Sequence, residues 1–204
     1  GANFPLIFAL ISFVVGIAIG STVIISQYFG AKQMDNVKKA IDTLYIFMFF
    51  ASIVITTIGI LGSEYIFQLI SLPDDVIKPA VEYFNVYALG FVFFFGFQGT
   101  SAILRGLGDS KTPLYFLIIS TLVNIVLDLF FVLVLDWGVR GVAAATVIAQ
   151  AGAFITIIWY LNKYHSFIDF SPMKMKFDRA IFSKSLKIGL PSGFQQTFVS
   201  FGFL

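Results

Sequence analysis

The chain has 204 residues, of which 58% are hydrophobic and only 12% are charged, and its mean hydropathy is +0.93. A soluble domain carries about 25% charged residues, so this composition excludes a soluble globular protein and indicates an integral membrane protein. The chain has no cysteine, which excludes disulfide and thiolate chemistry, and its net charge of only +2 gives no reason to expect a nucleic-acid partner.

Five complete apolar stretches follow one another along the chain, and each reaches the ~20 residues that a helix needs to cross the hydrocarbon core of a bilayer. They cover about residues 4–29, 41–62, 80–104, 113–135 and 139–161, and a sixth begins at 188. Strands of a membrane barrel alternate polar and apolar residues, whereas these stretches are continuously apolar. We therefore expect an all-α polytopic membrane protein that contacts the lipid bilayer.

The two ends of the chain both suggest a longer protein. The first stretch is too long for a signal peptide and lacks a basic start and a small-residue cleavage site. Gly1 is not an initiator methionine, and Leu204 lies inside an apolar run. We expect that further segments precede and follow this chain.

Basic residues are sorted strongly between alternate connections. Only Lys78 and Arg140 fall on one side, and the other eleven of the 13 basic residues fall on the opposite side. The positive-inside rule then predicts that the loops near residues 35, 108 and 175 are cytoplasmic, in a multi-pass protein of the plasma (inner) membrane.

Residues 163–187 form the one long connection, and six of the basic residues lie in it. Within it Asp178 is placed to cap a short helix. The apolar residues of that helix are Phe177, Ile181, Phe182 and Leu186. Two interpretations stay open: an amphipathic segment on the cytoplasmic membrane surface, or a solvated basic linker.

Small residues recur at a spacing of four in two stretches. The first carries Ser12, Gly16 and Gly20, and the fifth carries Gly141, Ala145, Ala149 and Ala153. Small residues at this spacing let neighbouring helix backbones approach closely, so these stripes predict a tight bundle.

Asp128 is the acidic residue that lies inside a span, where a carboxylate costs ~2.5 kcal/mol or more. Asn124 lies one helical turn before it, and Ser120 and Thr121 lie another turn back, so these side chains make a polar stripe. We expect this stripe to face the bundle interior or a wet cavity.

A carboxylate with neutral oxygens beside it suits a hard cation such as Na⁺, and a buried carboxyl can instead carry a proton. Thr146 and Gln150, one turn apart in the fifth stretch, are candidate supporting groups. The alternative is a polar contact that serves helix packing alone. No cofactor is expected beyond a coupling ion. The spans hold no Ser/His, His/Glu or paired-carboxylate set, so we do not expect an enzyme.

Several segments together resemble the multidrug and toxic compound extrusion (MATE) family. They are Ser26–Ala31, Leu104–Pro113, Asn124 with Asp128, Trp137–Ala145 and Ile188–Ser192. These segments are in the family's order and cover nearly the whole chain.

The resemblance implies the N-terminal six-helix lobe, lacking its first helix, of a two-lobe, twelve-helix antiporter. Residues 1–162 would form the N-lobe bundle with helices two to six, 163–187 the linker between lobes, and 188–204 the start of helix seven. Such proteins export organic cations in exchange for Na⁺ or H⁺. The family's cation site uses Asn and Asp on helix five and Thr on helix six, which correspond to Asn124, Asp128 and Thr146. The family's further Asp on helix one would lie before Gly1.

Three alternative functions stay open. A lipid-linked oligosaccharide flippase of the same superfamily should line its cavity with basic residues, and no Lys or Arg lies in the interior of a span, since Arg140 is at the edge of the fifth. An intramembrane enzyme lacks a catalytic constellation. A purely structural scaffold would use Asp128 for assembly.

Overall fold

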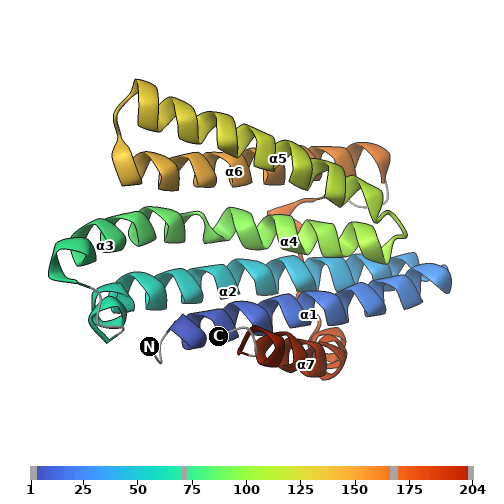
Figure 1. Ribbon diagram of the computed structural model, residues 1–204. Coiled ribbons are helices and arrows are strands. Elements are labelled where there is room, and N and C mark those ends of the chain that lie inside the picture. The colour runs from blue at the N-terminus through green and yellow to red at the C-terminus, as the bar shows by residue number, and fades with distance from the viewer. Residues whose placement is uncertain (1–3, 70–72, 166–169, 202–204) are drawn as a thin grey trace.

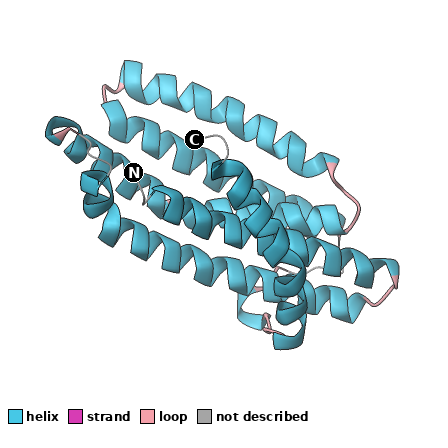
Figure 2. Ribbon diagram, turned by 60° about the horizontal axis from the view of Figure 1, so that its bottom comes forward, coloured by secondary structure: helices cyan, strands magenta, loops and turns pink. Residues whose placement is uncertain are grey.

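The computed structural model describes residues 4–69, 73–165 and 170–201, and this part of the chain contains helices and short connections without a strand (Figure 2). The predicted all-α fold is confirmed. The helices are α1 Phe4–Gly30, α2 Met34–Leu69, α3 Asp74–Leu89, α4 Phe91–Gly106, α5 Lys111–Leu129, α6 Gly138–Tyr164 and α7 Arg179–Phe201, with a π-helical turn at Phe130–Val134 and a 3₁₀ turn at Pro172–Lys174.

The long helices run back and forth in layers (Figure 1). α5 and α6 pair along one side, α3 and α4 lie end to end in the middle, α2 and α1 follow, and α7 packs against α1. In the described chain α1, α2, α5 with its π turn, and α6 are long and apolar enough to cross a membrane, and α3 with α4 makes a fifth span if the bent pair counts as one. The predicted apolar stretches lie within these helices.

The third predicted stretch is not one straight helix. It is divided into α3 and α4, which meet at Gly90 with a bend of 45°. A Cβ at Gly90 would lie 2.7 Å from Cγ2 of Val147, so α6 approaches closely at the bend. The Thr56 hydroxyl of α2 donates to the Ala88 carbonyl at 2.9 Å. The bend is therefore stabilised by two neighbouring helices, which a single apolar run does not reveal.

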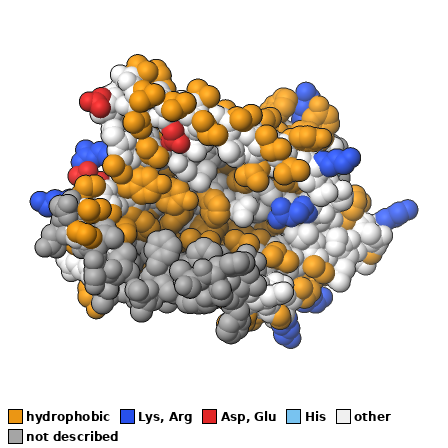
Figure 3. All heavy atoms as spheres, viewed as in Figure 1, with side chains coloured by type: hydrophobic (Ala, Val, Ile, Leu, Met, Phe, Trp, Pro, Cys, Tyr) orange, Lys and Arg blue, Asp and Glu red, His pale blue; other side chains and the backbone are white. Residues whose placement is uncertain are grey.

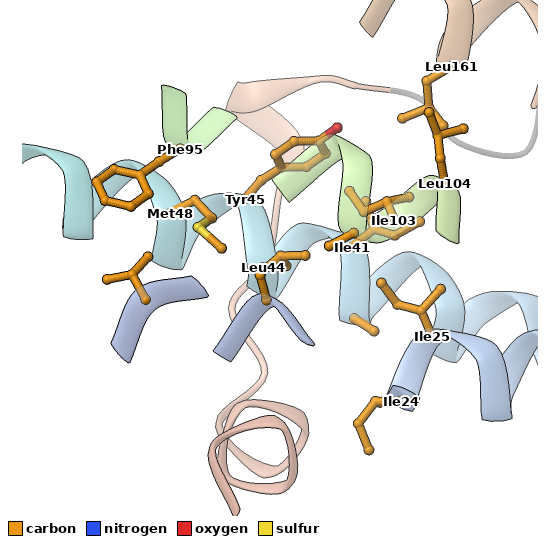
Figure 4. Close-up of a cluster of buried hydrophobic side chains, with 14 of the residues drawn as sticks. Ile24, Ile25, Ile41, Leu44, Tyr45, Met48, Phe95, Ile103, Leu104 and Leu161 are labelled. Carbon is orange, nitrogen blue, oxygen red and sulfur yellow. The ribbon is translucent and has the colours of Figure 1, made fainter. Parts of the chain in front are cut away.

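Apolar side chains of α1, α2, α4 and α6 form the core (Figure 4). Ile25, Leu44 and Phe95 are fully buried, and Leu161 of α6 points toward Leu104 of α4. The hydroxyl of the buried Tyr45 lies 2.9 Å from Thr100 Oγ1, which in turn donates to the Gly96 carbonyl. This chain of bonds satisfies the hydroxyl groups of Tyr45 and Thr100 inside the core.

The small-residue stripe of α1 packs against small residues of α7. A Cβ on Gly16 would lie 2.7 Å from the Gly189 carbonyl oxygen, and one on Gly20 would overlap the carbonyl oxygen of Ser185. No side chain separates the two backbones at these points. The stripe of α6 contributes buried alanines at positions 145, 149 and 153.

The segment predicted to lie on the membrane surface forms the first turns of α7 and is not a separate helix. Asp178 caps it as predicted, since its Oδ1 accepts from the backbone N–H groups of Ala180 at 2.9 Å and Ile181 at 3.0 Å. Ile181 is buried, and the ring of Phe182 lies 5.2 Å from that of Phe47 in α2. Part of the apolar side of this segment is thus covered by neighbouring helices, while Phe177 stays exposed.

The α4–α5 connection gives structural roles to Gly108 and Asp109 of the segment Leu104–Pro113. Gly108 has a φ of +92°, and the Asp109 N–H donates back to the Leu104 carbonyl at 2.8 Å. Asp109 Oδ1 accepts from the Thr112 N–H at 3.0 Å. Burial alone would raise the pKa of Asp109, but its hydrogen bonds with Thr112 and Lys111 and the charge of His165 together lower it. Asp109 therefore serves as an ionised cap for α5.

Basic side chains gather at the end of the bundle where α1, α4 and α6 finish, on the right in Figure 3. At the opposite end Arg140 of α6 binds Glu82 of α3 through two contacts of 2.9 and 2.7 Å. The charge asymmetry found in the sequence is thus an asymmetry between the two ends of the bundle.

Candidate functional site

The polar stripe of α5 ends at a distorted corner. One residue after Asp128 the helix finishes, and a π-helical turn follows at Phe130–Val134. The ring of Phe131 stacks on Trp137 with centroids 5.0 Å apart, and a Cβ on Gly141 would meet the Phe131 side chain at 3.0 Å. π-helical turns often occur at functional sites because they re-aim neighbouring side chains. This corner holds the C-terminal end of α5, where Asp128 lies, against α6.

Two residues of the stripe bond across to α6. The Ser120 hydroxyl donates to the Ala149 carbonyl at 3.0 Å. Nδ2 of Asn124 donates to Oγ1 of Thr146 at 3.3 Å. The predicted association of Asn124 with Thr146 is therefore present as a direct contact between the two helices.

The orientation of the Asn124 amide follows from the bonds of Thr146. The Thr146 hydroxyl donates its single proton to the Val142 carbonyl at 3.0 Å. It can only accept from Asn124, so the amide must turn its NH₂ group toward Thr146. The amide oxygen of Asn124 is then left as an acceptor, one helical turn from the carboxylate of Asp128.

Asp128 has an unsatisfied oxygen. Its Oδ1 is buried and has no hydrogen-bond partner among the described residues. A buried carboxylate oxygen without a partner carries a desolvation cost, so this position is suited to a proton or a cation.

The remaining candidates, Gln150 and Thr121, differ in their surroundings. Oε1 of Gln150 is also buried without a hydrogen-bond partner in the described chain, so it adds a second unsatisfied oxygen on α6. Thr121 is exposed and donates to the Leu117 carbonyl of its own helix at 2.9 Å. The structure brings Ser120, Asn124 and Thr146 to one helix interface and leaves Thr121 outside it.

The donor set contains oxygens and no nitrogen or sulfur ligand. Carboxylate, amide and hydroxyl oxygens suit a hard ion and do not suit a transition metal. In the described residues no group of three His, Cys, Asp or Glu side chains is placed to hold a metal ion. The residues therefore fit Na⁺ or a proton better than a structural or catalytic metal.

Sequence reasoning missed the π turn. The turn consists of Phe, Val and Leu residues, which are equally compatible with a regular α-helix. Its position depends on tertiary packing against α6.

Comparisons with known proteins identify similar chains along the whole length. The MatE family model matches residues 1–130. The probable multidrug resistance protein YoeA of Bacillus subtilis (strain 168) is 34% identical over 204 residues, which cover 97% of this chain and 44% of that protein. The probable multidrug resistance protein YpnP of the same organism is 30% identical over 98% of this chain and 44% of its own length.

A solved structure has the same fold. It is described as the inward-facing conformation of a multidrug resistance MATE family transporter of the MOP superfamily. Its TM-score is 0.87 at 24% identity, and the match covers 96% of this chain and 44% of that one. The chain thus spans less than half the length of the proteins it matches.

Proposed function

The chain belongs to the MATE family, and we propose from that premise that the full-length protein is a secondary antiporter and not an enzyme. It exports cationic and aromatic organic compounds in exchange for Na⁺ or H⁺. The names of the two Bacillus subtilis relatives, both probable multidrug resistance proteins, support export of drugs or toxic compounds. No cofactor takes part beyond the coupling ion.

The observation that carries this proposal is the unpartnered, buried Oδ1 of Asp128. A structural acid in a helix interface should have its oxygens satisfied, because an unsatisfied buried group is costly. Asp128 instead has an oxygen left open beside the fixed pair Asn124 and Thr146. A bound Na⁺ or proton would supply the positive charge that this carboxylate lacks.

Ion and drug are coupled through the packing around this site. The carboxylate lies next to the π turn, which packs on α6, so a change of its charge alters how α5 is held against α6. A ligand shifts a conformational equilibrium only by binding one state better than the other. The ionised and neutralised forms of Asp128 therefore favour different packings, and alternating access follows.

The charge distribution gives the orientation of this cycle. The end of the bundle with the C-termini of α1, α4 and α6 carries most of the basic side chains. By the positive-inside rule, the basic end of a membrane protein stays in the cytoplasm. We assign the protein to the plasma membrane and the loops near 35, 108 and 175 to its cytoplasmic side. Asp128 then lies in the outer half of the membrane, eight residues before Asp136 in the opposite loop.

The proposal is tested with the purified full-length protein in proteoliposomes. A fluorescent organic cation is followed under an imposed Na⁺ gradient, an imposed pH gradient, and no gradient. We expect transport under one of the two gradients and none without a gradient. Movement of a labelled lipid-linked oligosaccharide, with no gradient-driven cation transport, would instead identify a flippase.

A further inference from the structure

Most basic side chains at the cytoplasmic end of the bundle have no acidic partner. The described residues form two ion pairs: Lys38 with Asp42 at 2.6 Å, and Arg140 with Glu82 at the other end of the bundle. For the other Lys and Arg side chains, the described residues show no ion pair. This end thus carries more basic side chains than ion pairs that would neutralise them.

The junction of α1 and α7 concentrates this charge at a rigid place. Nζ of Lys184 lies 3.5 Å from the Tyr28 hydroxyl in the last turn of α1. Lys187 follows three residues later on the same side of α7, and both lysines are exposed. Ser185 and Ile181 of α7 are buried. The tight packing of α1 on α7 therefore holds Lys184 beside Tyr28, and Lys187 lies one helical turn further along α7.

Two like charges at this spacing repel each other in a helix. An anion between them replaces that repulsion with attraction, and the Tyr28 hydroxyl supplies a further hydrogen-bond donor. Tyr28 also lies where a membrane-crossing helix ends, which is the depth of lipid headgroups and a preferred place for tyrosine. The anion that occurs at this depth at high concentration is a phospholipid phosphate.

We propose that Tyr28, Lys184 and Lys187 bind the phosphate of an anionic phospholipid headgroup in the cytoplasmic leaflet. The lipid bridges the end of α1 and the beginning of α7 and so stabilises the contact between them. This site is separate from Asp128 and does not depend on whether the protein exports drugs.

The test uses the purified full-length protein in detergent and measures lipid binding by native mass spectrometry. Phosphatidylglycerol and phosphatidylcholine with the same acyl chains are compared. We expect wild type to prefer phosphatidylglycerol and Lys184→Gln/Lys187→Gln to bind it about 30-fold more weakly. The control Lys111→Gln/Lys163→Gln removes the same charge from the same end of the bundle and should keep the wild-type preference.

Equal weakening in both double variants would show diffuse attraction to a basic surface and overturn the proposal, as would no weakening in either. Binding of phosphatidylcholine and the melting temperature in phosphatidylcholine show that each variant is folded. A further arm adds inorganic phosphate at matched ionic strength. If it displaces phosphatidylglycerol specifically from wild type, the site is one for a free anion and the lipid assignment is wrong.

Discussion

At the scale of single residues, the α5–α6 interface contains one fixed polar contact and one unsatisfied acid. Thr146 has a single proton and gives it to its own helix, so it fixes the Asn124 amide with its oxygen directed elsewhere. Asp128 lies a turn away with an oxygen that no described group binds. We therefore propose that Asn124 and Thr146 act as positioning groups for an ion whose charge is balanced by Asp128.

Thr146→Val tests this role, because valine keeps the shape of threonine and removes the acceptor for Asn124. The loss of one hydrogen bond should raise the ion concentration for half-maximal drug export about three- to tenfold, with little change in the maximal rate. The measurement is drug export by the full-length protein at varied ion concentration.

Thr156→Val is the matched control on the same helix. Thr156 donates only to carbonyls of its own helix, at 2.7 and 3.1 Å, and contacts no residue of α5 through its hydroxyl. An equal shift in the two variants would show that the effect comes from the helix and not from the site.

The spacing of Ser120, Asn124 and Asp128 could be interpreted from the sequence because residues four apart share a helix face. The sequence did not show that Thr121 lies outside this group, since Thr121 is only one residue from Ser120. Its hydrogen bond to the Leu117 carbonyl of its own helix reflects which side of α5 faces α6, and that is known only from the folded bundle. The π turn could not be found at all, because its Phe, Val and Leu residues are equally compatible with a regular α-helix.

At the scale of elements, the tightest contact is the seam between α1 and α7. Glycines at 16, 20, 189 and 193 allow the two backbones to touch. In a bilayer, where apolar burial gives little drive for helix association, such close packing supplies much of the attraction. The seam therefore depends on the absence of Cβ atoms.

Gly20→Ala should destabilise the full-length protein by about 1–3 kcal/mol, because the new methyl group overlaps the Ser185 carbonyl oxygen and the helices must separate. Thermal unfolding in detergent measures the change.

Gly152→Ala on α6 is the matched control, and for it we expect no destabilisation. A Cβ there meets no atom within 4 Å, so the variant should be neutral or more stable by up to about 1 kcal/mol. Equal destabilisation by both substitutions would remove the argument that close approach at the seam is what requires glycine.

Continuous apolar runs predicted that the elements would be helices, because each run is long enough to cross a bilayer. They did not predict the division at Gly90, which arises from Val147 and Thr56 on neighbouring helices. They also did not predict that the segment after Asp178 continues as one helix and packs on α2. Its amphipathic pattern is the same whether lipid or protein covers the apolar side.

At the scale of the whole molecule, the bundle has a basic end and an opposite end tied by Arg140 and Glu82. The chain spans 44% of the length of its relatives YoeA and YpnP. Orientation of this part in the membrane decides from which side Asp128 is reached.

The chain has no cysteine, so single cysteines can be placed in it as reporters. In a full-length protein without other cysteines, Lys111→Cys should react with a membrane-impermeant thiol reagent only from the cytoplasm. Lys78→Cys should react only from outside, as the positive-inside rule predicts. The reverse pattern would invert the assigned orientation.

The central claim is that Asp128 couples the ion to the drug, and ion-driven drug export by Asp128→Asn tests it most directly. Asparagine keeps the size of the side chain and removes its charge, and Thr121→Ala, outside the interface, serves as the control. In proteoliposomes of the full-length protein we predict that Asp128→Asn folds and inserts normally but shows no gradient-driven export, while Thr121→Ala exports like wild type. Export by Asp128→Asn at the wild-type rate under the same ion gradient would contradict the account.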